Sequence, residues 1–206
     1  MEKLKILPQT VYKFKCDKKL LKTINTLMES EQWEESKFNF RTVDERLEKK
    51  SSYNELIKWF DECLNQVKIE LEFQCDKLKI TQCWGNKNPF GHWHHPHIHS
   101  NSIVSGVFYV NSSNSNTWFS LKNIWDCLDV VNYKPFKLIY NESSSMIIHK
   151  NPTIAGELII FPSTLYHSVD EHKTGDEYRH SISFNAFPTG KIGSFSALSG
   201  LEIEIK

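Results

Sequence analysis

The sequence predicts a mainly β protein in which N-terminal helices precede an antiparallel β core. Two stretches with apolar residues at helical spacing lie before residue 76, and short runs of β-branched and aromatic residues follow it. Turn residues separate these runs, and such a series of short strands is typical of a sandwich or barrel. The 206 residues include 13 Phe, 7 Tyr and 6 Trp, which suffice for one substantial core. We therefore expect a single domain over residues 1–206.

The N-terminal part is expected to contain one strand and two helices. Residues 5–15 alternate loosely and predict an initial strand, and residues 18–32 carry the apolar spacing of a first helix. Residues 34–50 are polar with little periodicity, so we expect mostly loop there. Residues 52–73 predict a second helix that starts with a Ser-x-x-Glu capping box. We expect its apolar stripe to pack in the core.

Eight strands are expected after Asp76, and they define the rest of the domain. Their predicted ranges are 78–84, 105–110, 117–121, 136–140, 146–149, 157–161, 180–187 and 201–205. We expect residues 1–77 to buttress the sheet, residues 78–190 to form the core and residues 191–206 to add a C-terminal strand. The polar segments 34–50 and 111–116 are the expected lid regions of a site carried by this scaffold.

Charge and cysteine usage exclude several classes of protein. Lys plus Arg equals Asp plus Glu, at 25 each, so the basic excess of a typical nucleic-acid-binding protein is missing. The charged start lacks a signal-peptide core, and no apolar window is long enough for a membrane helix. Five scattered cysteines without a Cys-x-x-Cys pair favour free thiols in a reducing cytosol. We expect a soluble cytoplasmic protein, with the oligomeric state left open, a homodimer included.

A histidine cluster is the strongest functional signal in the chain. Five of the nine histidines fall within residues 92–99, and such density most often indicates a metal site. Residues two apart in a strand face the same side, so His97 and His99 would present two imidazoles together. His95 with His97 obeys the same parity, but Pro96 suggests that the strand begins only after it. We therefore prefer His97 and His99 as the pair of ligands.

The remaining histidines are assigned by their surroundings. His167 follows a buried-type strand and a turn, and it is the best third ligand for an open, catalytic site. His92, His94 and His95 are expected at the rim of the pocket. His172 stands between Glu171 and Lys173 and is expected to be solvated.

A second signal lies twelve residues after the third histidine. Strand parity places Arg179, Ser181 and Ser183 on one side of a strand, with Ile182 and Phe184 on the other. A guanidinium on an enclosed face suits an anionic ligand, because its planar fork matches a carboxylate. We expect a carboxylate-bearing cosubstrate beside the metal.

Three motifs together give the chain a family resemblance. The runs from His97 to Val110, from Gly156 to His167 and from Arg179 to Asn185 resemble the iron(II)- and 2-oxoglutarate-dependent oxygenase superfamily. More narrowly, they are similar to a prolyl-hydroxylase-like branch common in phages and marine bacteria. The resemblance covers about residues 78–190 and implies a double-stranded β-helix, or jelly roll.

The resemblance also implies the cofactors and the residues that bind them. It places Fe(II) on His97, His99 and His167, and the far carboxylate of 2-oxoglutarate on Arg179 and Ser181. Trp84 and Asn86 match a Trp-x-Asn element of this branch, which implies that Asn86 reaches the cosubstrate. The implied activity is a dioxygenase, an oxidoreductase that oxidises an unidentified small molecule or peptide with release of succinate and CO2.

One position departs from the pattern of the superfamily. His99 stands where an Asp or Glu usually completes the set of ligands, so either His99 is a ligand or only His97 and His167 bind. Two rival functions stay open. A cupin-type dioxygenase would use three histidines without 2-oxoglutarate, and a non-enzymatic β-sandwich module would hold a structural zinc. The arginine argues for the cosubstrate, and the three histidines argue for the cupin-type rival.

Overall fold

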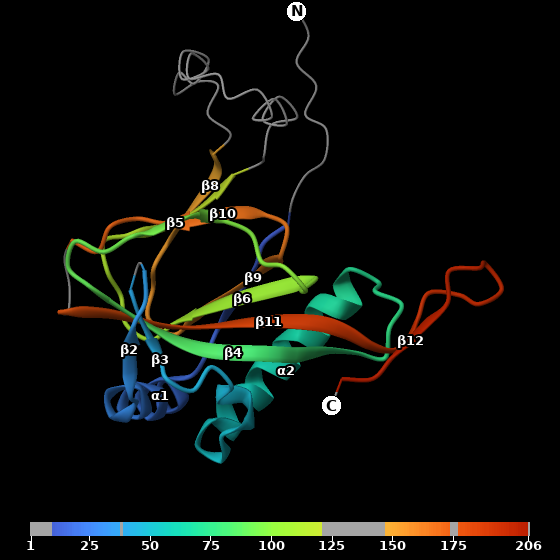
Figure 1. Ribbon diagram of the computed structural model, residues 1–206, viewed down its shortest axis with the longest axis horizontal. Coiled ribbons are helices and arrows are strands. Elements are labelled where there is room, and N and C mark those ends of the chain that lie inside the picture. Colours follow the sequence, from blue (N-terminus) through green and yellow to red (C-terminus); the bar gives the residue numbers. More distant parts are fainter. Residues whose placement is uncertain (1–9, 38, 121–146, 174–176, 206) are drawn as a thin grey trace, which may run out of the picture.

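Two antiparallel β-sheets face each other, and two α-helices lie on the outer side of the larger sheet (Figure 1). The computed structural model describes residues 10–37, 39–120, 147–173 and 177–205. The helical elements are α1 (Lys18–Ser30), η1 (Leu47–Lys49), η2 (Ser51–Tyr53) and α2 (Asn54–Glu70). The strands are β1 (Tyr12–Lys15), β2 (Trp33–Glu35), β3 (Phe40–Thr42), β4 (Lys77–Pro89), β5 (His94–His97), β6 (Val104–Tyr109), β7 (Asn116–Ser120), β8 (Ile147–Pro152), β9 (Glu157–Pro162), β10 (Tyr166–Val169), β11 (Tyr178–Ile192) and β12 (Leu201–Ile203).

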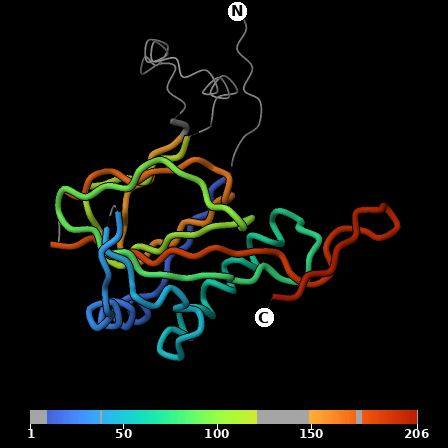
Figure 2. Tube along the Cα trace, in the orientation of Figure 1, coloured from blue at the N-terminus to red at the C-terminus, as the bar shows by residue number. Residues whose placement is uncertain are grey.

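The two sheets form the opposite walls of the β core (Figure 2). The larger has eight strands in the order β1-β9-β6-β11-β4-β3-β2, with β12 paired to β11, and the smaller has four in the order β5-β10-β7-β8. All named pairs are antiparallel. The predicted mainly β class with N-terminal helices is therefore confirmed.

The N-terminal part differs from the prediction in three places. Residues 34–50, expected to be mostly loop, also contain strand residues 34–35 and 40–42, because β2 and β3 form a hairpin that extends the large sheet beyond β4. The predicted capping box is also wrong: a 3-10 turn precedes α2, whose N-cap residue, Tyr53, makes no side-chain cap. Helix α1 is capped instead by Asp17, whose carboxylate accepts the backbone N–H of Leu20 at 2.8 Å.

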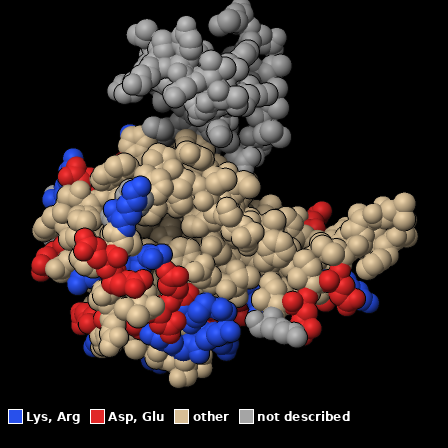
Figure 3. Space-filling model, in the orientation of Figure 1, with Lys and Arg blue, Asp and Glu red and all other residues tan. Residues whose placement is uncertain are grey.

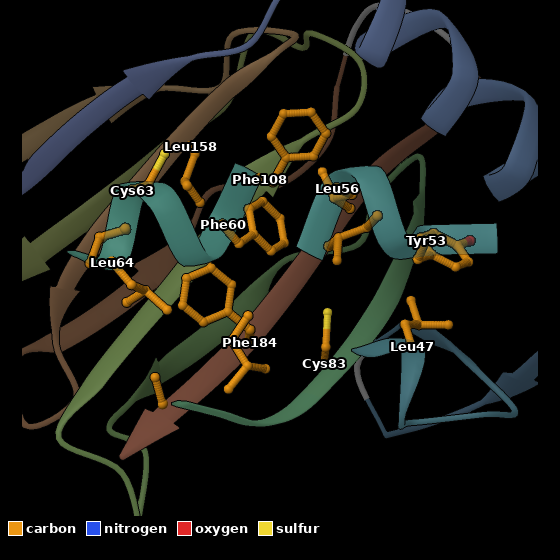
Figure 4. Packing of buried hydrophobic residues seen from close by; sticks show 14 of the residues in the cluster. Leu47, Tyr53, Leu56, Phe60, Cys63, Leu64, Cys83, Phe108, Leu158 and Phe184 are labelled. Atoms are coloured by element: carbon orange, nitrogen blue, oxygen red, sulfur yellow. The ribbon is translucent and has the colours of Figure 1, made fainter. Parts of the chain in front are cut away.

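The hydrophobic core lies between α2 and the outer face of the large sheet. Phe60 of α2 is fully buried, and its ring centroid lies 4.9 Å from that of Phe184 and 5.9 Å from that of Phe108 (Figure 4). Leu56 and Leu64 lie on the same side of the helix and are also buried. The apolar stripe of this helix is core packing, as predicted.

The strand boundaries show where tertiary pairing overrides local pattern. Strands β4 and β11 are longer than predicted, because they pair along 77–89 and 178–189. Strand β10 was not predicted, and it pairs with both β5 and β7. The predicted strand 136–140 lies outside the described residues. Cys16, Cys63, Cys75 and Cys83 are free thiols, and no helix in the described part is long and apolar enough to cross a membrane.

Candidate active site

Three imidazoles converge on the inner side of the small sheet. His97 ends β5 and pairs directly with His167 of β10, while His99 follows the strand and donates its backbone N–H to the carbonyl of Ser163 at 2.9 Å. The ligand atoms of the three side chains lie within 4.8 Å of one another. The Nε2 atoms of His99 and His167 are 3.2 Å apart.

The predicted start of this strand is wrong. Strand β5 begins before Pro96, which it tolerates because β5 is the edge strand of the small sheet and the proline faces solvent. His99 lies beyond the strand, so simple alternation does not explain why it faces His97. The loop after β5, held by Ser163, turns the second imidazole back toward the first.

Backbone carbonyls orient two of the three rings. Nδ1 of His97 lies 2.8 Å from the carbonyl oxygen of His95, and Nδ1 of His167 lies 2.9 Å from that of Leu165. A carbonyl only accepts, so Nδ1 of each ring is the donor and Nε2 of a neutral ring carries the free lone pair. This second hydrogen bond is the usual device that fixes a metal-binding histidine.

Burial keeps these imidazoles neutral. Burial, helped by the neighbouring His97 and His94, lowers the pKa of His99 to about 4. The same two causes hold the pKa of His167 well below its ordinary value, and burial lowers the pKa of His97. Neutral imidazole is the form that binds a cation, so the cluster is ready for a metal ion at neutral pH.

The cluster lies between two hollows that share part of their lining. An inner cavity of about 70 Å³ lies between the sheets, and an outer one of about 420 Å³ opens beside β2 and β3. His97 and His99 line both, as do Trp84 and Asn86. In the space-filling view this face is hollowed between the sheets, with acidic and basic side chains gathered beside the opening (Figure 3).

Arg179 is the buried cation of the inner cavity. Its side chain is 2 % exposed, and Nη1 donates to Ser115 Oγ at 2.6 Å and to the carbonyl of Asp170 at 3.1 Å. Burial lowers its pKa. Among the described residues no carboxylate lies within ion-pair distance of Arg179; the carboxylate of Asp170 instead accepts from Asn116. A buried cation without a counter-ion calls for an anionic ligand.

The predicted parity of β11 is confirmed. Arg179, Ser181 and Ser183 line the inner cavity, whereas Ile182 and Phe184 are fully buried in the core on the other side. The structure thus brings the predicted arginine and serines onto the face that holds the histidines.

Asn86 also faces the cavity, but its amide already has partners. Its Nδ2 donates to Ser183 Oγ at 3.0 Å, and its Oδ1 accepts from Asn39 Nδ2 at 3.0 Å. Asn39 in turn accepts the hydroxyl of Ser36 at 2.7 Å. This chain of hydrogen bonds ties the β2–β3 hairpin to β4 and β11 at the mouth of the site.

The other histidines divide differently from the prediction. His94 is more than a rim residue: it lines both hollows, and burial lowers its pKa to about 4. His92 and His95 line neither hollow. His172 is not solvated but fully buried, with its ring stacked 4.8 Å from that of Phe90. The charged neighbours Glu171 and Lys173 gave no indication in the sequence that His172 is buried.

Three residues of the site carried no signal in the sequence. Tyr109 and Thr117 line the inner cavity beside Arg179, and their hydroxyls hydrogen-bond each other. Burial raises the pKa of Tyr109 to about 12, so it stays a neutral hydroxyl. Asn88 lines the same cavity on the strand next to Arg179. These residues lie in strand patterns that predict core or surface equally well. Pairing with β11 places Asn88 and Tyr109 on one sheet, and the packing of the two sheets brings Thr117 to Tyr109.

Comparisons with known proteins agree with this geometry. A family model described as "Putative 2OG-Fe(II) oxygenase" matches residues 82–185. A prolyl-4-hydroxylase from Pseudomonas putida has a similar structure, with a TM-score of 0.61, 12% identity, and coverage of 88% of this chain and 94% of that one. HygX from Streptomyces hygroscopicus, solved with nickel, 2-oxoglutarate and hygromycin B, gives a TM-score of 0.63 at 10% identity, covering 88% and 84%.

A third solved structure is also similar to this chain. A Trichoplax adhaerens prolyl hydroxylase in complex with a hypoxia inducible factor peptide fragment gives a TM-score of 0.57 at 14% identity, covering 86% of this chain and 83% of that one. These likenesses show a shared fold, and the jelly roll implied by the sequence is thereby confirmed. No protein of curated function matches the chain by sequence.

Proposed function

The chain belongs to the family of 2OG-Fe(II) oxygenases, and on that premise we propose that it uses Fe(II) and 2-oxoglutarate to oxidise a substrate with O2, releasing succinate and CO2. One observation carries this proposal. Three neutral imidazoles and a buried guanidinium that forms no ion pair among the described residues line a single inner cavity. The imidazoles suit a metal ion, and the guanidinium suits a dicarboxylate bound next to it.

The donor set fits Fe(II). His97, His99 and His167 would hold the ion, because imidazole nitrogen is a good ligand for iron and three protein ligands leave positions open for catalysis. The 3.2 Å between Nε2 of His99 and Nε2 of His167 suits two nitrogens that share one ion at about 2.1 Å each. The carbonyls of residues 95 and 165 would keep two of the rings in place.

Arg179 would bind the far carboxylate of 2-oxoglutarate. The ligand is a dianion, so it supplies the negative charge that the buried guanidinium lacks. Ser181 lies two residues further along the same face and would donate its hydroxyl. Asn86 would act on the cosubstrate indirectly: its amide holds the hydroxyl of Ser183 in place on the cavity face of β11.

Fe(II) and 2-oxoglutarate, when bound, supply the oxidising chemistry; the chain supplies orientation and a dry setting. Phe161 and Val107 form apolar wall on the cavity side of β9 and β6, which limits water near the reacting groups. The neutral rings of His97 and His99 face the outer hollow, so a substrate bound there lies next to the cluster.

The outer hollow would receive the substrate. It is lined by Lys37, Arg41 and Glu45 together with amide side chains, so it can take a polar molecule. Of the similar solved structures, one holds hygromycin B and another holds a peptide fragment. The substrate we propose is accordingly a polar small molecule or a peptide segment.

The test measures cofactor binding and turnover separately. Anaerobic addition of Fe(II) and 2-oxoglutarate should produce the weak visible charge-transfer band of a chelated keto acid, and O2 should then yield succinate. His97→Ala and His167→Ala should abolish both. Tight zinc binding with no band would refute the proposal and favour the structural-zinc module.

The three histidines are also compatible with a second candidate function. A cupin-type dioxygenase would also use three imidazoles, but it would oxidise its substrate without 2-oxoglutarate. Turnover that needs Fe(II) and O2 but is indifferent to 2-oxoglutarate would select this alternative. The buried Arg179 is the observation that places it second.

A further inference from the structure

Asn88 carries a buried hydrogen-bond donor that nothing in the described chain satisfies. Its side chain is 3 % exposed and lines the inner cavity, and Nδ2 has no hydrogen-bond partner among the residues that the structure describes. A buried, unpaired amide donor is destabilising, and such groups are rare in folded proteins. An unpaired donor that faces a cavity therefore points to a ligand that accepts from it.

The strand register gives this donor its place in the site. Asn88 of β4 is the direct antiparallel partner of Arg179 of β11, so the two side chains emerge on the same face. Asn86 lies one step along that face and is the useful contrast, because its Nδ2 already donates to Ser183. The unpaired amide is thus the one next to the guanidinium.

The guanidinium of Arg179 leaves room for a second donor to a bound carboxylate. Nη1 of Arg179 already serves Ser115 and Asp170. A carboxylate has two oxygens and about four lone-pair directions, so it can accept from arginine and from a further donor at once. A neutral amide beside the arginine adds this donor without adding charge.

We propose that Asn88 is a further binding residue for the keto acid: its Nδ2 donates to the same far carboxylate that Arg179 binds. This inference rests on the proposed function, because it takes 2-oxoglutarate as the ligand. It assigns Asn88 a part in choosing a five-carbon dicarboxylate over keto acids that lack the second carboxylate.

The test compares two keto acids on Asn88→Leu. Full-length protein loaded with Ni(II) in place of Fe(II) is titrated by calorimetry with 2-oxoglutarate and with 2-oxobutanoate, which lacks the far carboxylate. Losing a hydrogen bond to a charged group should raise the Kd of 2-oxoglutarate about tenfold or more. The Kd of 2-oxobutanoate and that of Ni(II) should change by less than about threefold.

Stability of the ligand-free protein supplies the second readout. Leucine removes the unpaired donor, so the urea midpoint of Asn88→Leu should stay constant or rise. The matched control is Asn151→Leu, a fully buried asparagine outside both hollows whose Nδ2 donates to Glu157 at 2.9 Å. That variant should lose stability and keep its affinity for 2-oxoglutarate.

The outcomes separate the inference from its premise. A lower urea midpoint with an unchanged Kd for 2-oxoglutarate would make Asn88 a structural residue and overturn the inference. Failure of the wild-type protein to bind 2-oxoglutarate would instead refute the proposed function. If leucine prevents folding, the near-isosteric Asn88→Asp replaces the donor by a negative charge, and it should weaken 2-oxoglutarate more than 2-oxobutanoate; equal weakening would count against the inference.

Discussion

Removing the guanidinium of Arg179 is the most informative single change in this site. Arg179→Met keeps most of the apolar stem and deletes the charge, its bonds to Ser115 and Asp170, and the proposed contact to 2-oxoglutarate. A charge-assisted hydrogen bond contributes about 1.5–3 kcal/mol, so the Kd of 2-oxoglutarate should rise about 10- to 150-fold. Arg179→Lys keeps the charge without the planar fork, so its Kd for 2-oxoglutarate should lie between those of the wild type and Arg179→Met.

The stability of this variant can be estimated from the same contacts. Two lost hydrogen bonds from a charged donor cost about 3–6 kcal/mol, while removing a buried cation that forms no ion pair among the described residues recovers part of that cost. The free energy of unfolding should therefore fall by less than about 6 kcal/mol. Calorimetric titration of the Ni(II)-loaded protein measures the Kd, and urea denaturation measures the stability. Loss of metal affinity with an unchanged Kd for 2-oxoglutarate would refute this reasoning.

Three other perturbations test the ligands and the core. His99→Ala should weaken Ni(II) binding at least about tenfold, and His99→Asp should restore it, since Asp is the usual ligand at this position in the superfamily. Equal Ni(II) affinity in the wild type and His99→Ala would mean that only His97 and His167 bind the ion. Phe60→Ala should lower the free energy of unfolding by about 3–5 kcal/mol in urea, because this fully buried ring packs against those of Phe108 and Phe184. Burial raises the pKa of the Cys63 thiol to about 12, so above pH 9 the unfolded chain loses this proton first and stability falls toward pH 12. Cys63→Ala should flatten that slope, and an unchanged slope would contradict the assignment.

The sequence predicted the elements whose pattern is local. Helix α2 was recognisable because Leu56, Phe60 and Leu64 recur at helical spacing and face the core. The face of β11 was recognisable because Arg179 and Ser181 alternate with apolar residues. In both cases burial follows the period of the backbone, so residue order alone is informative.

The sequence did not predict features that depend on contacts between residues far apart in the chain. Strands β2 and β3 form within a stretch expected to be mostly loop because β4 offers β3 an edge, and their own polarity does not indicate it. His172 is buried beneath Phe90 despite its charged neighbours. Tyr109, Thr117 and Asn88 meet across three strands, and no local spacing encodes such a meeting. The predictable part of the site is therefore its arginine and its histidine cluster, and the unpredictable part is the set of neutral donors around them.

The pairing of His97 with His167 would give a metal ion bound there a mechanical role as well. Strand β5 is a short edge strand with a register shift in its pairing to β10, and it is the kind of segment that frays first. An ion held by both strands would act as a cross-link that closes the chain between His99 and His167, 68 positions apart. Loop-closure entropy grows only with the logarithm of length, so doubling that loop would cost about 0.6 kcal/mol. The stabilisation from such a cross-link would therefore depend only weakly on the length of the chain between its two ligands.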